Sequence, residues 1–487
     1  MARRRDGDGT RARHRRGRDT HPPRLLHGRL ARTNPQIRRP TVTQDPRPKI
    51  VRGAKPESGH YEEFLAHPAH FLYRAWKECG ELAEFDLHGR RHVLVASPDA
   101  QEAVFRAPDE QLSTAAAYQY MVPVFGEGIQ YGAPLEVERQ QVKFLSNSLR
   151  PDKMKAYAQV IAQEAEDFIA DWGDEGEKDF YETFKDLVLR TSTHCLMGET
   201  FRRKLTTEFG ELFHDLEDAI SPSAVIDAYS EDEEFARRDK ARARLQTMLM
   251  QVVAERRAST EEAAPDMLQT FLEARYADGS PLADELIPGM IVWIMFAGFH
   301  TSSNTASWVS LELARHPEYQ REVAAEVDAV YGHGEDLSFT ALRELPTLEG
   351  FVDEALRLHP PLVAMMRQVM QPFEYKGNTF EVGTNIVISP YVSHRLPDHF
   401  PNPEHFDPHR GLPKHIFAEV SFGGGKRKCI GNAFAYLQVK AIFTALLSRY
   451  ELSLVDPPES YQEIMPSLIL RPSDPCRLRY RRRSRAS

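Results

Sequence analysis

The residues best suited to chemistry gather around one cysteine. Residues 421–431 read SFGGGKRKCIG, and a helical pattern begins directly after them. Three glycines permit a tight backbone path there. The N–H groups at the start of the following helix, and the charges of Lys426, Arg427 and Lys428, favour the thiolate form of Cys429. A thiolate held at such a junction is a candidate axial ligand for haem iron.

Two other interpretations of this segment compete with a haem site. A phosphate-binding loop is disfavoured because no GKS or GKT follows the glycines. An inert buried cysteine is disfavoured by the three adjacent cations. The remaining cysteines, Cys79, Cys195 and Cys476, are too few and too scattered for a disulfide framework or a CxxC metal clip.

Two further groups of residues could support chemistry. Glu354 and Arg357 are spaced i to i+3, so a helix would place them on one face where they can form a charge pair. Such pairs are also common on helix surfaces. In residues 297–302, small side chains leave room for a ligand, Thr301 offers a hydroxyl, and His300 offers an imidazole, a group that can relay protons. An isolated helical threonine more often bonds to its own helix.

The elements that must position these residues are mostly helices. Helical periodicity marks 61–79, 160–172, 281–315, 337–358 and 432–450, with Pro288, Gly289 and Gly298 interrupting the third. Residues 85–97 predict a hairpin, 373–389 predict short strands, and 396–426 predict a loop. No linker divides the chain after its head. We therefore expect a mainly α fold with small β-sheets (α+β), as one large domain over 49–482.

The two ends of the chain carry most of its positive charge. Residues 1–50 sum to about +11 and residues 471–487 to +6, although the whole chain is −9. The head has several prolines and no apolar face, so 1–48 predicts an Arg-rich disordered segment rather than a nucleic-acid binder. Residues 483–487 predict a basic tail. The longest apolar run, 286–299, is too short to span a membrane. These features favour a cytoplasmic monomer.

The cysteine segment resembles a known signature. Phe422, Gly425, Arg427, Cys429 and Gly431 stand at the spacing of the haem-binding motif of cytochromes P450. The resemblance implies the fold of that family, haem b as cofactor, and Cys429 as the metal ligand. It also implies that Phe422 shields the sulfur and that Arg427 meets a haem propionate. Gly425 and Gly431 would shape the loop at the cofactor.

The resemblance extends to the other two motifs. It implies that Glu354 and Arg357 are structural and meet Arg410 from a later loop. It also implies that Thr301 and His300 are catalytic, relaying protons to bound O2. Many family members carry an acidic residue where this chain has His300.

The histidine before Thr301, the segment 118–134 and Met365-Met366-Arg367 resemble the sterol 14α-demethylases, most closely their soluble bacterial members. This implies that Tyr118, Arg367 and Arg427 bind haem propionates, with Arg139 assisting. It further implies a large apolar pocket, although each lining residue could equally be ordinary core. The implied pocket residues are Tyr120, Met121, Phe125, Tyr131, Phe296, Ala297, Val363, Ala364, Met365 and Leu468.

The implied function is a haem-thiolate monooxygenase that removes a sterol 14α-methyl as formate in three successive oxidations. One departure stands out, because Gly132 occupies a position where the demethylases usually have Asp. Hydroxylation of a terpenoid or another secondary metabolite is the alternative, and a non-catalytic haem sensor or carrier is a third. No flavin, dinucleotide or iron–sulfur motif is present. The expected electron donors are a ferredoxin and its reductase, which Lys426 and Lys428 could contact.

Overall fold

Helices form most of the molecule, as the periodicity predicts. The computed structural model describes residues 47–204, 207–260, 266–331 and 337–484. The expected head therefore lies outside the described residues, apart from its last two positions. Of the expected tail, Arg483 is described, and its guanidinium pairs with Asp328 at 2.6 Å. That arginine thus contacts the folded body.

The helices have the following bounds: α1 Tyr61–Ala66, α2 Pro68–Cys79, α3 Pro98–Arg106, α4 Thr114–Ala117, α5 Val122–Phe125, α6 Leu135–Ser148, α7 Pro151–Ile169, α8 Phe180–Met197, α9 Glu199–Lys204, α10 Thr207–Asp218, α11 Pro222–Ile226, α12 Glu233–Ala258, α13 Met267–Glu273, α14 Ile287–Arg315, α15 Pro317–Tyr331, α16 Phe339–Arg343, α17 Pro346–Leu358, α18 Pro390–Ser393 and α19 Asn432–Leu447. Short 3-10 turns lie at Gln119–Met121, Gln130–Gly132, Asp284–Leu286, Gly425–Arg427 and Pro458–Ser460.

The strands form small sheets. They are β1 Lys49–Ile50, β2 Leu82–Leu87, β3 Arg90–Val95, β4 Leu112–Ser113, β5 Glu175–Asp179, β6 Met365–Val369, β7 Phe373–Tyr375, β8 Asn378–Phe380, β9 Asn385–Ile388, β10 Tyr450–Leu454, β11 Glu463–Ile464, β12 Arg471–Pro472 and β13 Arg477–Arg482. One sheet has the order β1-β2-β3-β9-β6-β4, another β10-β13-β5, and β7-β8 and β11-β12 are two-stranded. The expected α+β class is confirmed.

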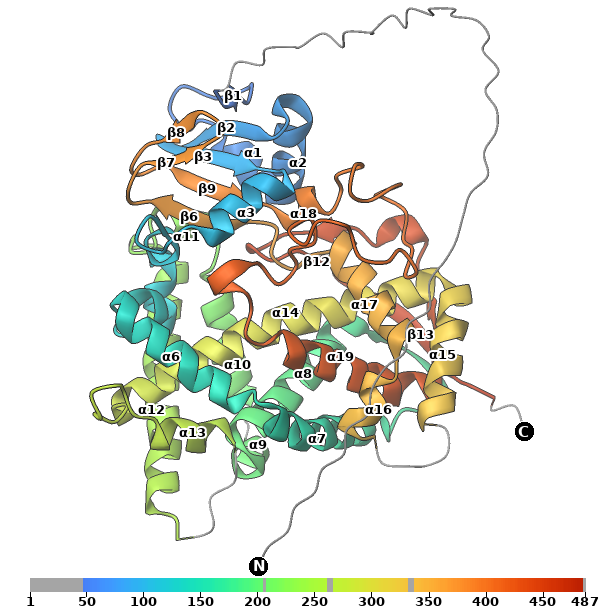
Figure 1. The fold of residues 1–487 in the computed structure, drawn as a ribbon. Helices are drawn as coiled ribbons and strands as arrows, with labels where there is room; N and C mark the ends of the chain where they lie inside the picture. Colours follow the sequence, from blue (N-terminus) through green and yellow to red (C-terminus); the bar gives the residue numbers. More distant parts are fainter. Residues whose placement is uncertain (1–46, 205–206, 261–265, 332–336, 485–487) are drawn as a thin grey trace, which may run out of the picture. The chain divides into compact units, whose positions relative to one another are not determined.

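The long helix α14 runs through the middle of the helical layer (Figure 1). The expected helix at 281–315 starts at Ile287, because Pro288 fits the first turn, where no N–H partner is needed. It then continues unbroken through Gly298. By length and composition α14, extended back to Asp284, could cross a bilayer, but 72% of its apolar window is buried against the rest of the protein. The apolar run 286–299 therefore lies in a helix at the core of the described protein.

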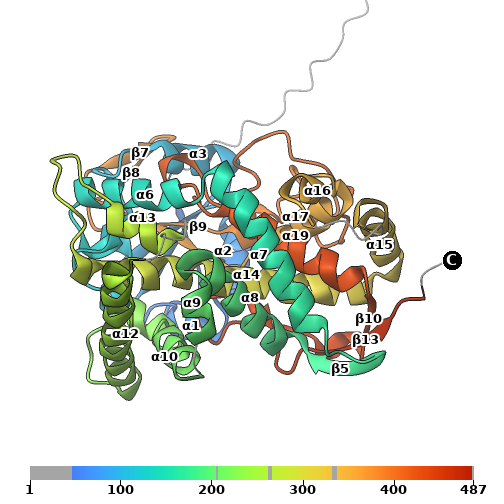
Figure 2. The same cartoon turned by 90° about the horizontal axis from the view of Figure 1, so that it is seen from below.

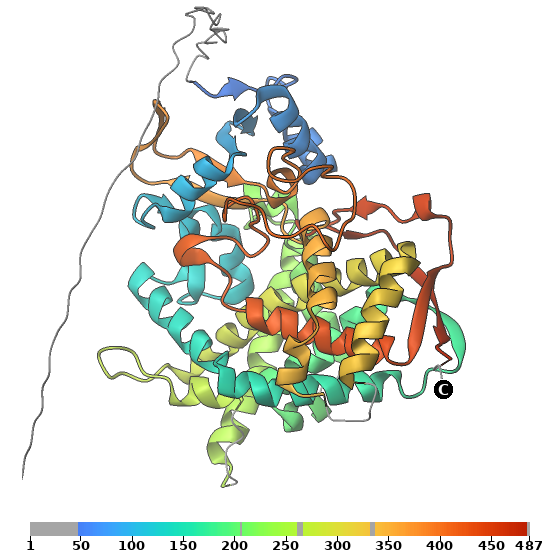
Figure 3. The same cartoon turned by 45° about the vertical axis from the view of Figure 1, so that its right-hand side comes forward.

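Two other views show what surrounds α14. From below, α7 crosses in front of α19 and α14, and α8 lies beside α14 (Figure 2). Turned by 45°, the view shows the loop before α19 passing between the helical layer and the sheet that contains β6 and β9 (Figure 3). The expected helix at 61–79 is two helices, since His67 is extended and Pro68 starts α2. The cysteine loop therefore lies where the helices and the main sheet meet.

Candidate active site

The cysteine loop is shaped by glycine and ends at a helix N-terminus. Gly425 has φ of +62°, and a Cβ there would overlap the carbonyl oxygen of Phe105. Only glycine suits this position without a shift of the backbone. The Cys429 N–H donates to the Phe422 carbonyl at 2.9 Å, which closes the loop just before α19 begins. The Phe422 ring lies 5.5 Å from that of Tyr436.

The Cys429 sulfur is set among backbone donors. Burial raises the pKa of the Cys429 thiol, while N–H groups of Gly431 and Asn432 and the charge of Lys428 lower it; burial is the largest effect and the pKa is raised overall. The thiolate form of Cys429 stays a prediction from the sequence. Coordination to a metal deprotonates a thiol outright, so iron would supply the missing stabilisation. Solvent reaches part of the Cys429 side chain, whereas Cys79, Cys195 and Cys476 are buried. The raised pKa of Cys429 reflects the protein packed around this partly accessible side chain.

Two carboxylates hold the side chain of Arg427. Its guanidinium donates to both oxygens of Glu138, at 2.5 and 3.0 Å, and to Asp109 at 2.8 Å. Glu138 is fully buried, so the pair is charge-compensated in the interior. Arg139 lies on the other side of Asp109 and pairs with Glu110 at 3.0 Å. The acidic partners of both arginines were not anticipated from the sequence.

Arg367 is the better placed cation for an anionic ligand. It is 7% exposed and donates to the Met366 carbonyl at 2.8 Å, and no described carboxylate lies within ion-pair distance of it. Burial lowers the pKa of Arg367; the nearby phenols of Tyr118 and Tyr131 raise it and Arg427 lowers it. A buried arginine without an anion is costly. These donors, together with the sulfur, fit a ligand that carries iron and carboxylates, as haem does.

On α14 two neighbouring residues face different surroundings. Thr301 is half-buried beside exposed Ala297, and its hydroxyl donates to the Ala297 carbonyl at 2.8 Å. That is the back-bond expected of an isolated helical threonine. His300 is 2% exposed, and its Nδ1 lies 3.1 Å from Oε1 of Glu217 on α10. Its Nε2 is buried without a hydrogen-bond partner among the described residues.

Glu217 was missed by the sequence analysis. Burial alone would raise its pKa, but the charges and hydrogen bonds of His300 and His214 lower the pKa of this carboxyl overall. An acidic side chain is therefore held ionised against His300. No sequence signal links the two, because the contact depends on how α10 packs over α14.

Aromatic side chains from the α4–α6 region gather near α14. The ring of Tyr131 stacks on Tyr118 at 5.2 Å and lies 6.3 Å from Phe125, which contacts Phe296 edge-on at 5.9 Å. The Tyr118 hydroxyl accepts from the Met366 N–H at 3.1 Å. The other expected pocket residues differ in exposure: Tyr120, Met121 and Val363 are buried, while Ala364, Met365 and Leu468 are half-buried. Burial alone does not separate a pocket wall from core packing.

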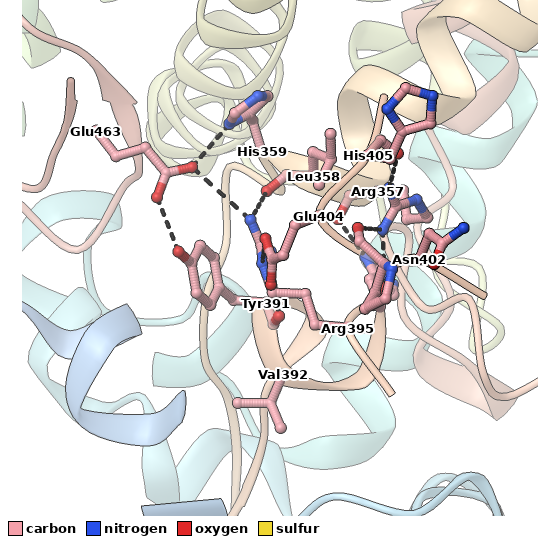
Figure 4. A network of polar contacts seen from close by, with 12 residues as sticks. Arg357, Leu358, His359, Tyr391, Val392, Arg395, Asn402, Glu404, His405 and Glu463 are labelled. Atoms are coloured by element: carbon pink, nitrogen blue, oxygen red, sulfur yellow. Dashed lines mark hydrogen bonds and ion pairs between the residues drawn. The ribbon is translucent and has the colours of Figure 1, made fainter. Parts of the chain in front are cut away.

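The charge pair on α17 is buried and bidentate. Arg357 donates to both oxygens of Glu354, at 2.7 and 2.8 Å, and Arg410 donates to the same carboxylate at 3.1 Å. Arg357 also binds the carbonyls of His394, Pro403 and His405 at 2.9, 2.7 and 3.3 Å. Figure 4 shows Arg357 beside the loop residues Asn402 and His405. The structure thus joins the three side chains that the sequence motif associates.

The comparisons with known proteins agree with this fold. The Cytochrome P450 family model matches residues 46–479. The retinoic acid-bound cyanobacterial CYP120A1 shares the fold at a TM-score of 0.81, with 23% identity over 90% of this chain and 99% of that one. The chain therefore belongs to the cytochrome P450 family, which oxidises substrates with O2 at a haem iron.

Within this family, the chain is similar to proteins named sterol 14α-demethylases. A protein of Mycolicibacterium vanbaalenii named sterol 14alpha-demethylase is 40% identical over 445 residues, covering 89% of this chain and 98% of that protein. The namesake of Mycobacterium tuberculosis is 40% identical over 444 residues, with the same coverage. A mouse lanosterol 14-alpha demethylase is 33% identical over 90% of this chain and 88% of its own. The resemblance to sterol 14α-demethylases is confirmed.

Proposed function

We propose that the protein removes the 14α-methyl group of a sterol in three successive oxidations that release formate. The observation that carries this proposal is the 40% identity to sterol 14α-demethylases over nearly the whole chain. The aromatic cluster of Tyr118, Phe125, Tyr131 and Phe296 provides apolar surface beside α14, as a rigid apolar substrate needs. We propose that the cofactor is haem b and that the enzyme is a cytoplasmic monomer.

Each site residue has a proposed task. Bound haem would supply the activation of O2. Cys429 would ligate its iron through Sγ, with Gly425 and Gly431 keeping the loop close. Arg367 and the Tyr118 hydroxyl would hold a propionate, while Arg427 and Arg139 would do so only by sharing their donors with Glu138, Asp109 and Glu110.

Protons would reach the reacting oxygen through α14. His300 can hold a proton between its Nδ1 and the Glu217 carboxylate, 3.1 Å apart. Thr301 can pass one on when its hydroxyl rotates away from the Ala297 carbonyl. A sensor or carrier would need no such pair, which favours the enzyme.

Electrons would come from an acidic ferredoxin and its reductase. Lys426 and Lys428 are exposed, so their charges are free to attract a partner beside Cys429. Arg427 is unavailable for this contact, since it is engaged with Glu138 and Asp109.

Gly132 keeps a second candidate open. A Cβ at this position would lie 3.1 Å from the Gly126 carbonyl oxygen and 3.2 Å from Cγ1 of Val122. The Asp that the demethylases usually carry there would require these neighbours to move by a few tenths of an ångström. A differently shaped wall would favour a terpenoid or another secondary metabolite as substrate.

The decisive experiment combines a carbon monoxide spectrum with an analysis of the sterol product. Reduced wild-type protein under carbon monoxide should show the strongly red-shifted Soret band of a thiolate ligand, and Cys429→Ser should lose it while Cys79→Ala keeps it. Wild-type protein with spinach ferredoxin, its reductase and NADPH should then convert lanosterol to its 14-desmethyl product with release of formate. A normal band without lanosterol turnover, but with hydroxylation of a sesquiterpene, would replace the sterol assignment by the second candidate.

A further inference from the structure

Two proposed walls of the substrate pocket are joined by backbone contacts. Residues 361–365 contribute Val363, Ala364 and Met365, and the turn between β11 and β12 contributes Leu468. The Leu470 N–H donates to the Pro361 carbonyl at 3.0 Å, and Leu362 forms a β-bridge with Ile469. The relative register of the two segments therefore sets how these side chains face each other.

A hydrogen bond between His359 and Glu463 links the starts of the two segments. His359 stands directly before Pro360, and Glu463 opens β11. The His359 Nδ1 lies 2.7 Å from Oε1 of Glu463, while the Tyr391 hydroxyl donates to Oε2 at 2.9 Å. Figure 4 shows Glu463 pointing toward both side chains. The Arg395 guanidinium lies 4.0 Å from Oε1 of Glu463. Replacing Glu463 should therefore alter the position of both pocket walls.

The histidine side of this bond is rigid. The His359 ring stacks on Trp308 of α14 at 3.8 Å, with 5° between the planes. Its Nε2 lies 3.3 Å from Oε1 of Glu312, also on α14. Burial would lower the pKa of His359, but the two carboxylates raise it overall. His359 is therefore held against α14 by a ring stack and a carboxylate, and its Nδ1 faces Glu463 at the start of β11.

The surrounding cleft argues for a positioning role rather than for a ligand site. It has a volume of about 440 Å³ and is lined by Glu312, Arg315, Arg395, Glu404 and Glu463, among others. Each of these five is already paired: Arg315 with Glu312 at 2.7 Å and Arg395 with Glu404 at 3.2 Å, besides the contacts of Glu463. Such a saturated network has few groups left to bind a molecule from solution.

We propose that Glu463 is a positioning residue that fixes the β11–β12 turn against residues 361–363, and so sets the shape of the outer substrate pocket. The inference rests on the proposed function, because it takes Val363, Ala364 and Leu468 as pocket walls. Glu463 touches neither substrate nor cofactor in this scheme. Loss of the Glu463 side chain should weaken the binding of bulky ligands and leave the binding of small iron ligands unaffected.

The test compares two azoles on four variants. Glu463→Ala removes both hydrogen bonds, Tyr391→Phe removes one, and Glu463→Gln can accept from His359 and donate to Tyr391. Econazole should bind roughly tenfold more weakly to Glu463→Ala and less so to Tyr391→Phe, whereas Glu463→Gln should restore most of the affinity. Imidazole should bind all variants with the wild-type Kd. The exposed Glu459 offers the matched control, as Glu459→Ala.

Other outcomes are equally clear. Equal loss of econazole and imidazole binding would mean that the cofactor side is disturbed, and unchanged econazole binding in Glu463→Ala would mean that the turn needs no such anchor; both overturn the proposal. If Glu463→Ala does not fold, Tyr391→Phe against wild type decides in the same way. Because the azoles report on the pocket without turnover, failure of lanosterol oxidation in wild type would overturn the proposed function alone.

Discussion

Burial, more than nearby charge, determines the acidity of single residues around the cysteine loop. For Cys429, burial outweighs two backbone donors and one lysine. The same holds for Asp353 on α17, whose pKa is raised to about 6; burial is the largest cause, Glu349 and Glu419 add to it, and Tyr436 and Lys440 oppose it. The Tyr436 hydroxyl donates to Asp353 and also places the ring that Phe422 contacts. The ionised form of Asp353 at neutral pH therefore lowers the stability of the folded protein.

Replacing Asp353 by Asn should stabilise the protein at neutral pH. Between pH 3.8 and about 6 the native protein binds more protons at Asp353 than the unfolded chain does. Stability therefore falls as pH rises through this window, and the deficit persists above it. Asp353→Asn keeps an acceptor for Tyr436 and removes the charge. We expect a gain of about 1–2 kcal/mol at pH 8 that vanishes below pH 4.

Urea unfolding at pH 4, 6 and 8 would measure this difference. Asp328, which is paired with Arg483, supplies the opposite control, because Asp328→Asn should destabilise at pH 8. A gain for Asp353→Asn that is the same at every pH would show that the carboxyl has an ordinary pKa.

At the scale of elements, one helix organises a long loop. Residues 394–410 contain almost no regular structure, yet the carbonyls of His394, Pro403 and His405 converge on Arg357. Because Arg357 is 3% exposed and its guanidinium is planar, it can bind Glu354 and these carbonyls together. The loop that leads to the cysteine segment is therefore ordered by α17.

Replacing Arg357 by Lys should disrupt this loop. A lysine offers three donors from one point and cannot bind Glu354 bidentately while reaching the carbonyls. The buried Glu354 would keep only Arg410 and the Asp407 N–H as partners. We expect a loss of at least about 3 kcal/mol and little bound haem.

The measurements are the urea midpoint and the haem absorbance per protein. Arg343→Lys changes an exposed arginine of α16 and should leave both unaltered. Haem content at the wild-type level in Arg357→Lys would contradict the role given to the loop.

At the scale of the whole molecule, the family match and the first described strand, β1, begin within a few residues of each other. The family model starts at residue 46, and Lys49 in β1 pairs in register with Ala83 in β2. The described residues from 47 onward include every motif of the site.

Deleting residues 1–48 should therefore leave catalysis intact. We expect the deletion variant to keep the carbon monoxide spectrum and to stay within about twofold of wild-type turnover, a free-energy change below 0.5 kcal/mol. Turnover with the surrogate donor system measures this directly. A loss beyond tenfold, with haem still bound, would mean that the head takes part in function.

The sequence by itself determined the features that depend on neighbouring residues. The cysteine loop, the pair of Glu354 and Arg357 and the α+β class follow from spacing, periodicity and turn residues, because these act over a few positions of the chain. The interruption expected at Pro288, Gly289 and Gly298 was wrong, since α14 is one helix from Ile287 to Arg315. The motif of the cysteine loop also identified the family.

Only the tertiary structure decided which distant groups meet. It brought Glu217 to His300, placed Glu138 and Asp109 on Arg427, and left Arg367 buried without a carboxylate among the described residues. It also joined His359 to Glu463 across two segments. Ion pairs of this kind need the packing of separate elements, and burial then sets their strength, so no local pattern could reveal them.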